Sequence, residues 1–205
     1  MKYIDLFNEL QLSRDYIHDR KTGADWRYHI DREARRVYVE VQETKTFLDW
    51  LHNLNVIPRK VYNSQGLVIK VPAGAYKQAE VITSHIMLAM TKPDMLDFDW
   101  YFCGWSLGGM SSGISAFMLS GIIPKVHYIG WGTPKFLSKE SVRAFLTSMK
   151  SWSNFLYRDD WITGLIPFYS RPDSEDVTPS NPDIPETLDQ RHRVYGHCIY
   201  PTEEF

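Results

Sequence analysis

Cysteine is scarce in this sequence. Cys103 and Cys198 are the only two among 205 residues, so the chain has no disulfide framework. We expect both to be free thiols of a cytoplasmic protein. His197 lies next to Cys198, but further ligands at close spacing are missing, so we expect no metal site and no other cofactor.

An excess of charge of one sign is also missing. The chain carries 23 basic and 25 acidic residues, for a net charge of −2, and has no run of basic residues. This balance argues against nucleic acid as the main partner. The length suffices for one domain with a substantial core, and we expect a single domain over residues 1–205.

A signal peptide and a Leu/Ile/Val-rich membrane segment are absent as well. Residues 1–16 form an amphipathic stretch that contains acidic residues, which favours a cytoplasmic location. Residues 100–124 contain no charge and could span a bilayer by length alone. Glycine and serine are spread throughout that segment, however, so we expect a buried strand and helix with no transmembrane segment.

The most informative stretch of the chain is G-x-S-x-G at residues 104–108, around Ser106. Aromatic residues typical of a buried strand precede it, and apolar residues at helical spacing follow it. This arrangement predicts a nucleophile elbow, a sharp strand-to-helix turn that projects a serine hydroxyl from the end of a sheet. Neighbouring backbone is crowded in such a turn, which explains small residues at Gly104 and Gly108.

Strand and helix patterns alternate along the rest of the chain. Strands are predicted at residues 25–31, 36–42, 67–71, 98–103, 125–131 and 154–158, and helices at residues 3–12, 46–55, 72–90, 107–118 and 138–149. Residues 14–23 and 171–189 are predicted to be a turn and an exposed loop. We therefore expect an α/β fold with a mostly parallel central sheet flanked by helices, and an antiparallel edge formed by the first two strands.

A serine needs a base to take its proton, and that base needs an orienting carboxylate. In α/β-hydrolases the order along the chain is serine, then Asp or Glu, then histidine. After Ser106, Asp159 and Asp160 follow a predicted strand, and His192 and His197 lie near the C-terminus. The order alone does not choose within either pair.

Several segments of the chain, taken in order from the N-terminus, resemble motifs of the class 3 (fungal-type) lipases of the α/β-hydrolase fold. The family's G-H-S-L-G-G elbow is similar to residues 104–109. The family's F-R-G-[ST]…D-W…D-L motif is similar to residues 41–44 and 49–54. Its F-G-x-P motif is similar to residues 131–134, its N-D-x-V-P motif to residues 159–163 and its Y-x-H motif to residues 195–197. The resemblance covers about residues 20–200.

The resemblance implies a role for each matching residue. Ser106 would be the nucleophile, His197 the general base and acid, and Asp160 the carboxylate that orients it. The backbone N–H groups of Leu107 and Thr44 would form the oxyanion hole. The segment before Val71 is short where true lipases often carry a lid, so we expect no large lid and a carboxylesterase-like or lipase-like enzyme acting on small-molecule or lipid esters.

Two departures from the family pattern lie beside the expected oxyanion hole. Glu43 replaces a glycine of the family, and Gln42 replaces an arginine. Two functional hypotheses follow. The first is a serine hydrolase that forms an acyl-enzyme on Ser106, with an acyltransferase as a variant. The second is a catalytically degenerate α/β-hydrolase-like protein that binds a ligand without turnover.

Overall fold

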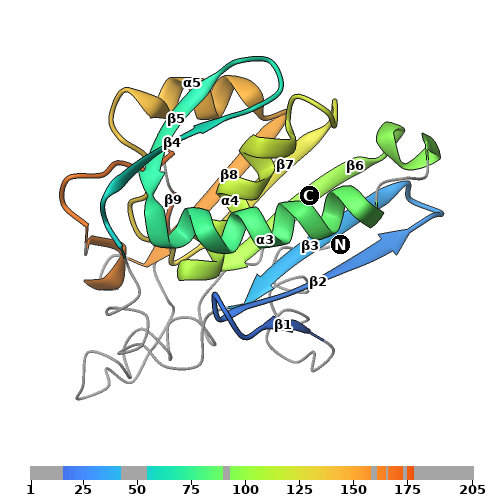
Figure 1. The fold of residues 1–205 in the computed structure, drawn as a ribbon. Helices are drawn as coiled ribbons and strands as arrows, with labels where there is room; N and C mark the ends of the chain where they lie inside the picture. Colours follow the sequence, from blue (N-terminus) through green and yellow to red (C-terminus); the bar gives the residue numbers. More distant parts are fainter. Residues whose placement is uncertain are drawn as a thin grey trace.

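The computed structural model describes residues 16–42, 55–89, 93–157, 161–164, 166–172 and 175–177. These residues form a seven-stranded sheet in the order β1-β2-β3-β6-β7-β8-β9 and a separate two-stranded sheet, β4-β5 (Figure 1). The strands are β1 (Ile17–Asp19), β2 (Ala24–Asp31), β3 (Arg36–Gln42), β4 (Pro58–Tyr62), β5 (Val68–Pro72), β6 (Asp99–Trp105), β7 (Val126–Trp131), β8 (Ser151–Tyr157) and β9 (Glu175–Val177). The helices are α3 (Ala73–Ala89), α4 (Leu107–Leu119) and α5 (Ser141–Ser148), with 3₁₀ turns at Pro93–Asp97 and Trp161–Gly164.

The large sheet is mixed but mostly parallel. The strands from β3 through β6, β7 and β8 to β9 pair in parallel. At one edge, β2 pairs antiparallel with both β1 and β3. This confirms the predicted α/β architecture and its antiparallel edge. Because parallel strands point the same way, β3, β6, β7 and β8 all end at the same edge of the sheet.

Helix α4 is the centre of the core. It packs on β3, β6 and β7, and α3 packs on α4 from the side away from the sheet (Figure 1). Every residue of α4 except Met118 is buried, which explains the uncharged segment of residues 100–124. In the described part of the chain, no helix is long and apolar enough to cross a membrane.

Close contact between α4 and the sheet depends on small side chains. A Cβ atom at Gly113 would come within 3.0 Å of the Tyr128 and Phe136 rings. On the sheet, Val39, Phe102 and Tyr128 lie in register on β3, β6 and β7 and belong to the same buried cluster as Phe117 of α4. Burial of these side chains supplies most of the stabilisation of this layer.

Several element boundaries differ from the sequence prediction. β1 lies within the predicted turn, β9 within the predicted loop, and β4 in a stretch for which no strand is predicted. β8 begins at Ser151, three residues early. Helix α5 begins at Ser141, three residues after the predicted start, with Glu140 at its N-cap position. The helix predicted at 3–12 and all but the last residue of the helix predicted at 46–55 lie outside the described residues.

Candidate active site

Ser106 occupies the turn between the last residue of β6 and the first residue of α4. Its backbone angles are φ 55° and ψ −123°. A positive φ is unfavourable for any residue with a Cβ atom, and such a conformation costs on the order of 1–3 kcal/mol. Among described residues other than glycine, only Arg35 shares a positive φ. The surrounding structure must therefore hold Ser106 in this strained conformation.

Glycines on both sides of Ser106 make the turn possible. A Cβ atom at Gly104 would lie 2.3 Å from the carbonyl oxygen of Gly108, and one at Gly108 would lie 2.3 Å from that of Val41. Both clashes are with backbone atoms, which cannot rotate away. These contacts are the physical reason for the G-x-S-x-G spacing, and they agree with the crowding expected from sequence.

Hydrogen bonds of the backbone fix the direction of the turn. The Ser106 N–H donates to the carbonyl of Trp131 on the neighbouring strand at 2.9 Å, and the Gly109 N–H donates to the Ser106 carbonyl at 3.0 Å. Ser106 is thus tied to both the sheet and the helix. Its side chain is 2% exposed.

The first turn of α4 offers backbone donors beside Ser106. Serine at an N-cap position commonly accepts a hydrogen bond from these N–H groups. Among the described residues, Ser106 makes no such side-chain cap. The N–H groups of Leu107 and Gly108 precede the first intrahelical hydrogen bond, so they can donate to an oxyanion at the helix N-terminus.

Three polar side chains support the turn from the core side, and sequence analysis assigned them no role. A Cβ atom at Gly109 would lie 2.1 Å from the Thr133 Oγ1, so this threonine packs directly against the start of α4. The Tyr128 hydroxyl donates to Thr133 Oγ1 at 3.4 Å, and Asn154, 1% exposed, lies beside Gly130. The only sequence signal for this support is the W-G-T-P segment at residues 131–134.

The predicted site residues divide into two groups. Gly104, Ser106, Leu107 and Gly108 lie together at the strand-to-helix turn. The remaining ones, Thr44, Asp160 and His197, lie outside the described residues, as do the alternatives Asp159 and His192 and the departure Glu43.

A cavity of about 530 Å³ lies elsewhere on the molecule. It is lined by Arg59, Lys60, Val61, Tyr62, Tyr76 and Met118. Met118 is twelve residues from Ser106 along α4, or roughly 18 Å at the helical rise. This cavity is therefore separate from the strand-to-helix turn. The described residues contain no group of acidic, cysteine and histidine side chains that could hold a metal ion.

Comparison with known proteins gives a clear result for the fold. No protein-family model matches the chain, and no curated protein matches it by sequence. A Rhizomucor miehei lipase, solved as a propeptide complex, matches with a TM-score of 0.67 over 89% of this chain and 64% of its own, at 13% identity. A triacylglycerol lipase from Penicillium expansum matches with a TM-score of 0.58 over 81% of this chain and 68% of its own, also at 13% identity.

A further match is a triacylglycerol lipase whose catalytic centre is formed by a serine protease triad, with a TM-score of 0.65 over 82% of this chain and 66% of that one, at 12% identity. Over most of its length, the chain thus has the α/β fold of the fungal class 3 lipases. It spans less than two thirds of the length of three matched lipase structures, 62% of a fungal lipase–inhibitor complex and 64% and 66% of two Rhizomucor miehei lipase structures.

Proposed function

We propose that this protein is a serine hydrolase of carboxylic esters and that Ser106 is its nucleophile. The observation that carries the proposal is the strained backbone of Ser106. Gly104 and Gly108 on either side of it have no room for a Cβ atom, so the surrounding structure enforces the strain. Strain of this kind persists where the surrounding structure enforces it, and it gathers at functional sites. A serine with an ordinary structural role has no need of it.

The proposed reaction has two half-reactions. The Ser106 hydroxyl attacks the ester carbonyl while His197 takes its proton, and the alcohol leaves with that proton to give an acyl-enzyme. Water then releases the acid by the reverse sequence of proton transfers. Asp160 orients His197, and the N–H groups of Leu107 and Thr44 stabilise the oxyanion.

The sheet topology supports this choice of partners. Thr44 follows Gln42, the last residue of β3, by two positions, and Asp160 follows Tyr157, the last residue of β8, by three. Both strands run parallel to β6, so the chain leaves each of them at the edge where Ser106 lies. The matched lipase whose catalytic centre is a serine protease triad has the same fold, and this likeness supports the proposed triad.

The substrate class rests on likeness of fold. Two of the matched structures are triacylglycerol lipases. We therefore propose a lipid ester or a small-molecule ester with an acyl chain. A short segment before Val71, where lipases often carry a lid, favours soluble esters over an oil–water interface.

The deciding experiment compares the wild type with Ser106→Ala. We expect a fluorophosphonate probe to label Ser106 in the wild type, as mapped by peptide mass spectrometry, and we expect the variant to lack a label on that peptide. Hydrolysis of p-nitrophenyl esters should fall by at least about 10³-fold in the variant, since the nucleophile is lost. A series of acyl-chain lengths then identifies the preferred substrate. A wild type that neither labels nor turns over any chain length would leave the ligand-binding reading in its place.

Matched pairs of variants test the other two members of the triad. We expect His197→Ala to lose activity and His192→Ala to keep it. Likewise, Asp160→Asn should slow turnover by about 10⁴-fold and Asp159→Asn should leave it near the wild-type rate. If the members of a pair behave the other way round, the role of base or of orienting carboxylate is assigned to the other member of that pair, and Ser106 remains the proposed nucleophile.

A further inference from the structure

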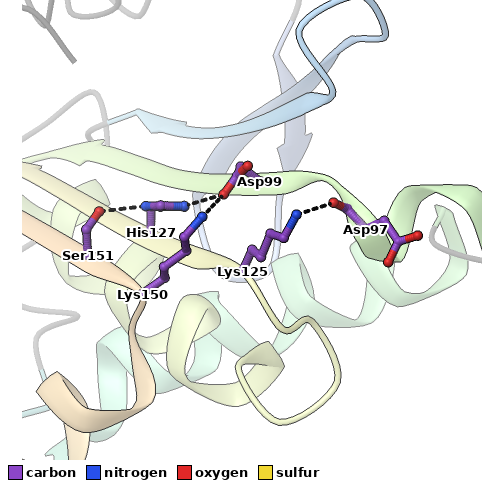
Figure 2. A network of polar contacts seen from close by, with 6 residues as sticks. All are labelled: Asp97, Asp99, Lys125, His127, Lys150 and Ser151. Atoms are coloured by element: carbon purple, nitrogen blue, oxygen red, sulfur yellow. Dashed lines mark hydrogen bonds and ion pairs between the residues drawn. The ribbon is translucent and has the colours of Figure 1, made fainter.

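A second serine lies in a chain of hydrogen bonds at the other end of the sheet. Figure 2 shows His127 between Ser151 and Asp99. Nδ1 of His127 lies 2.6 Å from the Ser151 Oγ, and Nε2 lies 2.8 Å from Asp99 Oδ1. Lys150 Nζ donates to the same carboxylate oxygen at 2.7 Å. The order serine, histidine, aspartate is that of a catalytic triad, with the two ring nitrogens exchanged, since here Nδ1 faces the serine and Nε2 faces the carboxylate.

Strand register assembles this group. His127 on β7 pairs with Ser151 on β8 and with Tyr101 on β6, so these side chains share one face of the sheet. Asp99 lies two residues before Tyr101 and therefore on the same face. The Tyr101 ring stacks on the His127 ring with centroids 4.4 Å apart and an interplanar angle of 14°, which fixes the imidazole plane.

The hydrogen bonds define which nitrogen of His127 is free to act as a base. An ionised carboxylate only accepts hydrogen bonds, so Nε2 must carry the proton that is donated to Asp99. Nδ1 is then an acceptor, and the Ser151 hydroxyl donates to it. Burial lowers the pKa of His127, and the hydrogen bond to Asp99 opposes that shift without reversing it, so the ring is neutral at pH 7.

Asp99 remains ionised in this setting. Burial acts to raise the pKa of its carboxyl, but hydrogen bonds from Lys150 and His127 outweigh burial and hold the pKa below its ordinary value. His127 itself is buried, with 8% of its side chain exposed, whereas Ser151 is exposed. The base is thus shielded from water and the hydroxyl is open to reagents.

We propose that Ser151 is a second activated serine, which accepts an acyl group from activated acyl donors such as aryl esters and acyl thioesters. The Ser151 oxygen attacks the donor's carbonyl carbon while His127 Nδ1 takes the hydroxyl proton. The bond to the phenolate or thiolate breaks, and the leaving group departs with its electron pair and takes up that proton. Ser151 then carries the acyl group as an ester.

Slow release distinguishes this site from a turnover site. The structure provides a base for Ser151, and its hydroxyl lies at the start of β8, not at a helix N-terminus. Acylation and hydrolysis both lack the backbone donors of a helix N-terminus, but acylation expels a stable phenolate or thiolate, whereas hydrolysis of the acyl-serine must expel the serine alkoxide, a much poorer leaving group. We therefore expect a single acylation event per chain, with retention of the acyl group.

The site is independent of the elbow. Ser151 is in register, through His127, with Tyr101, which lies five residues before Ser106, so the two serines lie at opposite ends of the parallel strands, roughly 17 Å apart along them. The experiment uses Ser106→Ala throughout, so its outcome does not depend on whether the elbow is active.

The test is acetylation of the Ser106→Ala protein by p-nitrophenyl acetate at pH 8. We expect one equivalent of p-nitrophenolate to be released and one acetyl group to map to Ser151 by peptide mass spectrometry. Adding Ser151→Ala should abolish that label, and adding His127→Gln should slow it by about 100-fold. The matched control is Ser84→Ala, since Ser84 is exposed and donates only to the Glu80 carbonyl at 2.8 Å. A label at Lys150, or equal labels at Ser84 and Ser151, would overturn the proposal.

A second pair of variants keeps His127 in place. In the same background, Ser151→Cys places a thiol next to Nδ1, and Ser84→Cys places one where the wild-type hydroxyl donates to a backbone carbonyl and not to an imidazole. We expect the thiol at position 151 to react with iodoacetamide on the order of tenfold faster at pH 7, after subtraction of the parent protein's own reaction. Equal alkylation rates at the two positions would show that His127 does not activate its neighbour, and would reject the proposal even if His127→Gln fails to fold.

Discussion

The two ends of the parallel sheet each present a serine, Ser106 after β6 and Ser151 at the start of β8, but they hold it by different means. At the carboxyl end, backbone geometry positions Ser106: a positive φ, two glycines without room for a Cβ atom, and a hydrogen bond to Trp131. At the amino end, side chains position Ser151, through His127 and Asp99. Backbone packing tolerates almost no substitution, whereas hydrogen-bonded side chains can be exchanged one at a time. The two ends should therefore respond to mutation on different scales.

The largest effect is expected from the glycine before Ser106. Gly104→Ala places a Cβ atom 2.3 Å from a backbone oxygen, and we expect it to lower the free energy of unfolding by at least about 3 kcal/mol. Urea denaturation measures the loss. Gly164→Ala is the matched control, because that position has open space around it and an ordinary φ. If the two variants are equally stable, backbone packing does not hold the turn.

Loss of the histidine at the amino end should have an intermediate effect. His127→Leu removes the partner of both Asp99 and Ser151, and we expect it to lower the free energy of unfolding by about 1–3 kcal/mol. Urea denaturation of the two proteins at pH 7 gives this difference, with Ser84→Ala as a neutral surface control.

The same pair of proteins tests the lowered pKa of His127. Below pH 6.5, unfolded His127 takes up a proton that the folded form, with its lower pKa, does not bind, so the wild type loses stability as the pH falls. His127→Leu lacks this loss, and the stability difference between the proteins should shrink from pH 7 to pH 5. The contribution of Asp99, whose pKa is also lowered, disappears only at lower pH, as the pH falls through its folded pKa. A constant difference would contradict the lowered pKa.

A smaller effect should reveal the strain at Ser106. Glycine tolerates a positive φ, so Ser106→Gly relieves strain that Ser106→Ala retains. The added freedom of glycine in the unfolded chain offsets part of the gain, and we expect Ser106→Gly to be more stable by about 1 kcal/mol. Thermal and urea unfolding of these two inactive variants decide the matter; equal stability would mean that the turn is not strained.

The smallest effect is expected at Lys150. Its side chain is about half exposed, and the ion pair with Asp99 is screened by solvent. Lys150→Met should therefore change the free energy of unfolding by less than about 1 kcal/mol, and the change should shrink further in about 0.5 M salt. A loss as large as that of His127→Leu would make the ion pair, and not the histidine, the main support of this end.

The turn around Ser106 could be predicted from sequence because the residues that report it are close together in the chain. Small residues two positions before and after a serine, between a strand pattern and a helix pattern, suffice to recognise it, although the contact that excludes a Cβ atom at Gly108 comes from Val41 on β3. The group around His127 could not, since its members lie 24 and 28 residues away from the histidine and meet only through strand register. No motif in a single segment reports such a meeting.

Three strands, β1, β4 and β9, could not be predicted because of their composition or length. β4 begins with Pro58 and carries Arg59 and Lys60, a composition that argues against a central strand. Within the described ranges it pairs only with β5, in a sheet of two strands, where a proline and charges are tolerated. β1 and β9 have three residues each, too few for an alternation to be recognised.

The separate β4–β5 sheet has a consequence for how the chain folds. β3 and β6 are neighbours in the large sheet, yet β4, β5 and α3 come between them in sequence (Figure 1). Their pairing must close a long loop, whereas β6, α4 and β7 meet through short connections, so contact order favours early formation of the β6–α4–β7 unit. Loop-closure entropy rises by only about 0.6 kcal/mol for each doubling of length. The crossover is thus a place where evolution can lengthen or shorten this chain at little thermodynamic cost, provided that both strands still reach their partners.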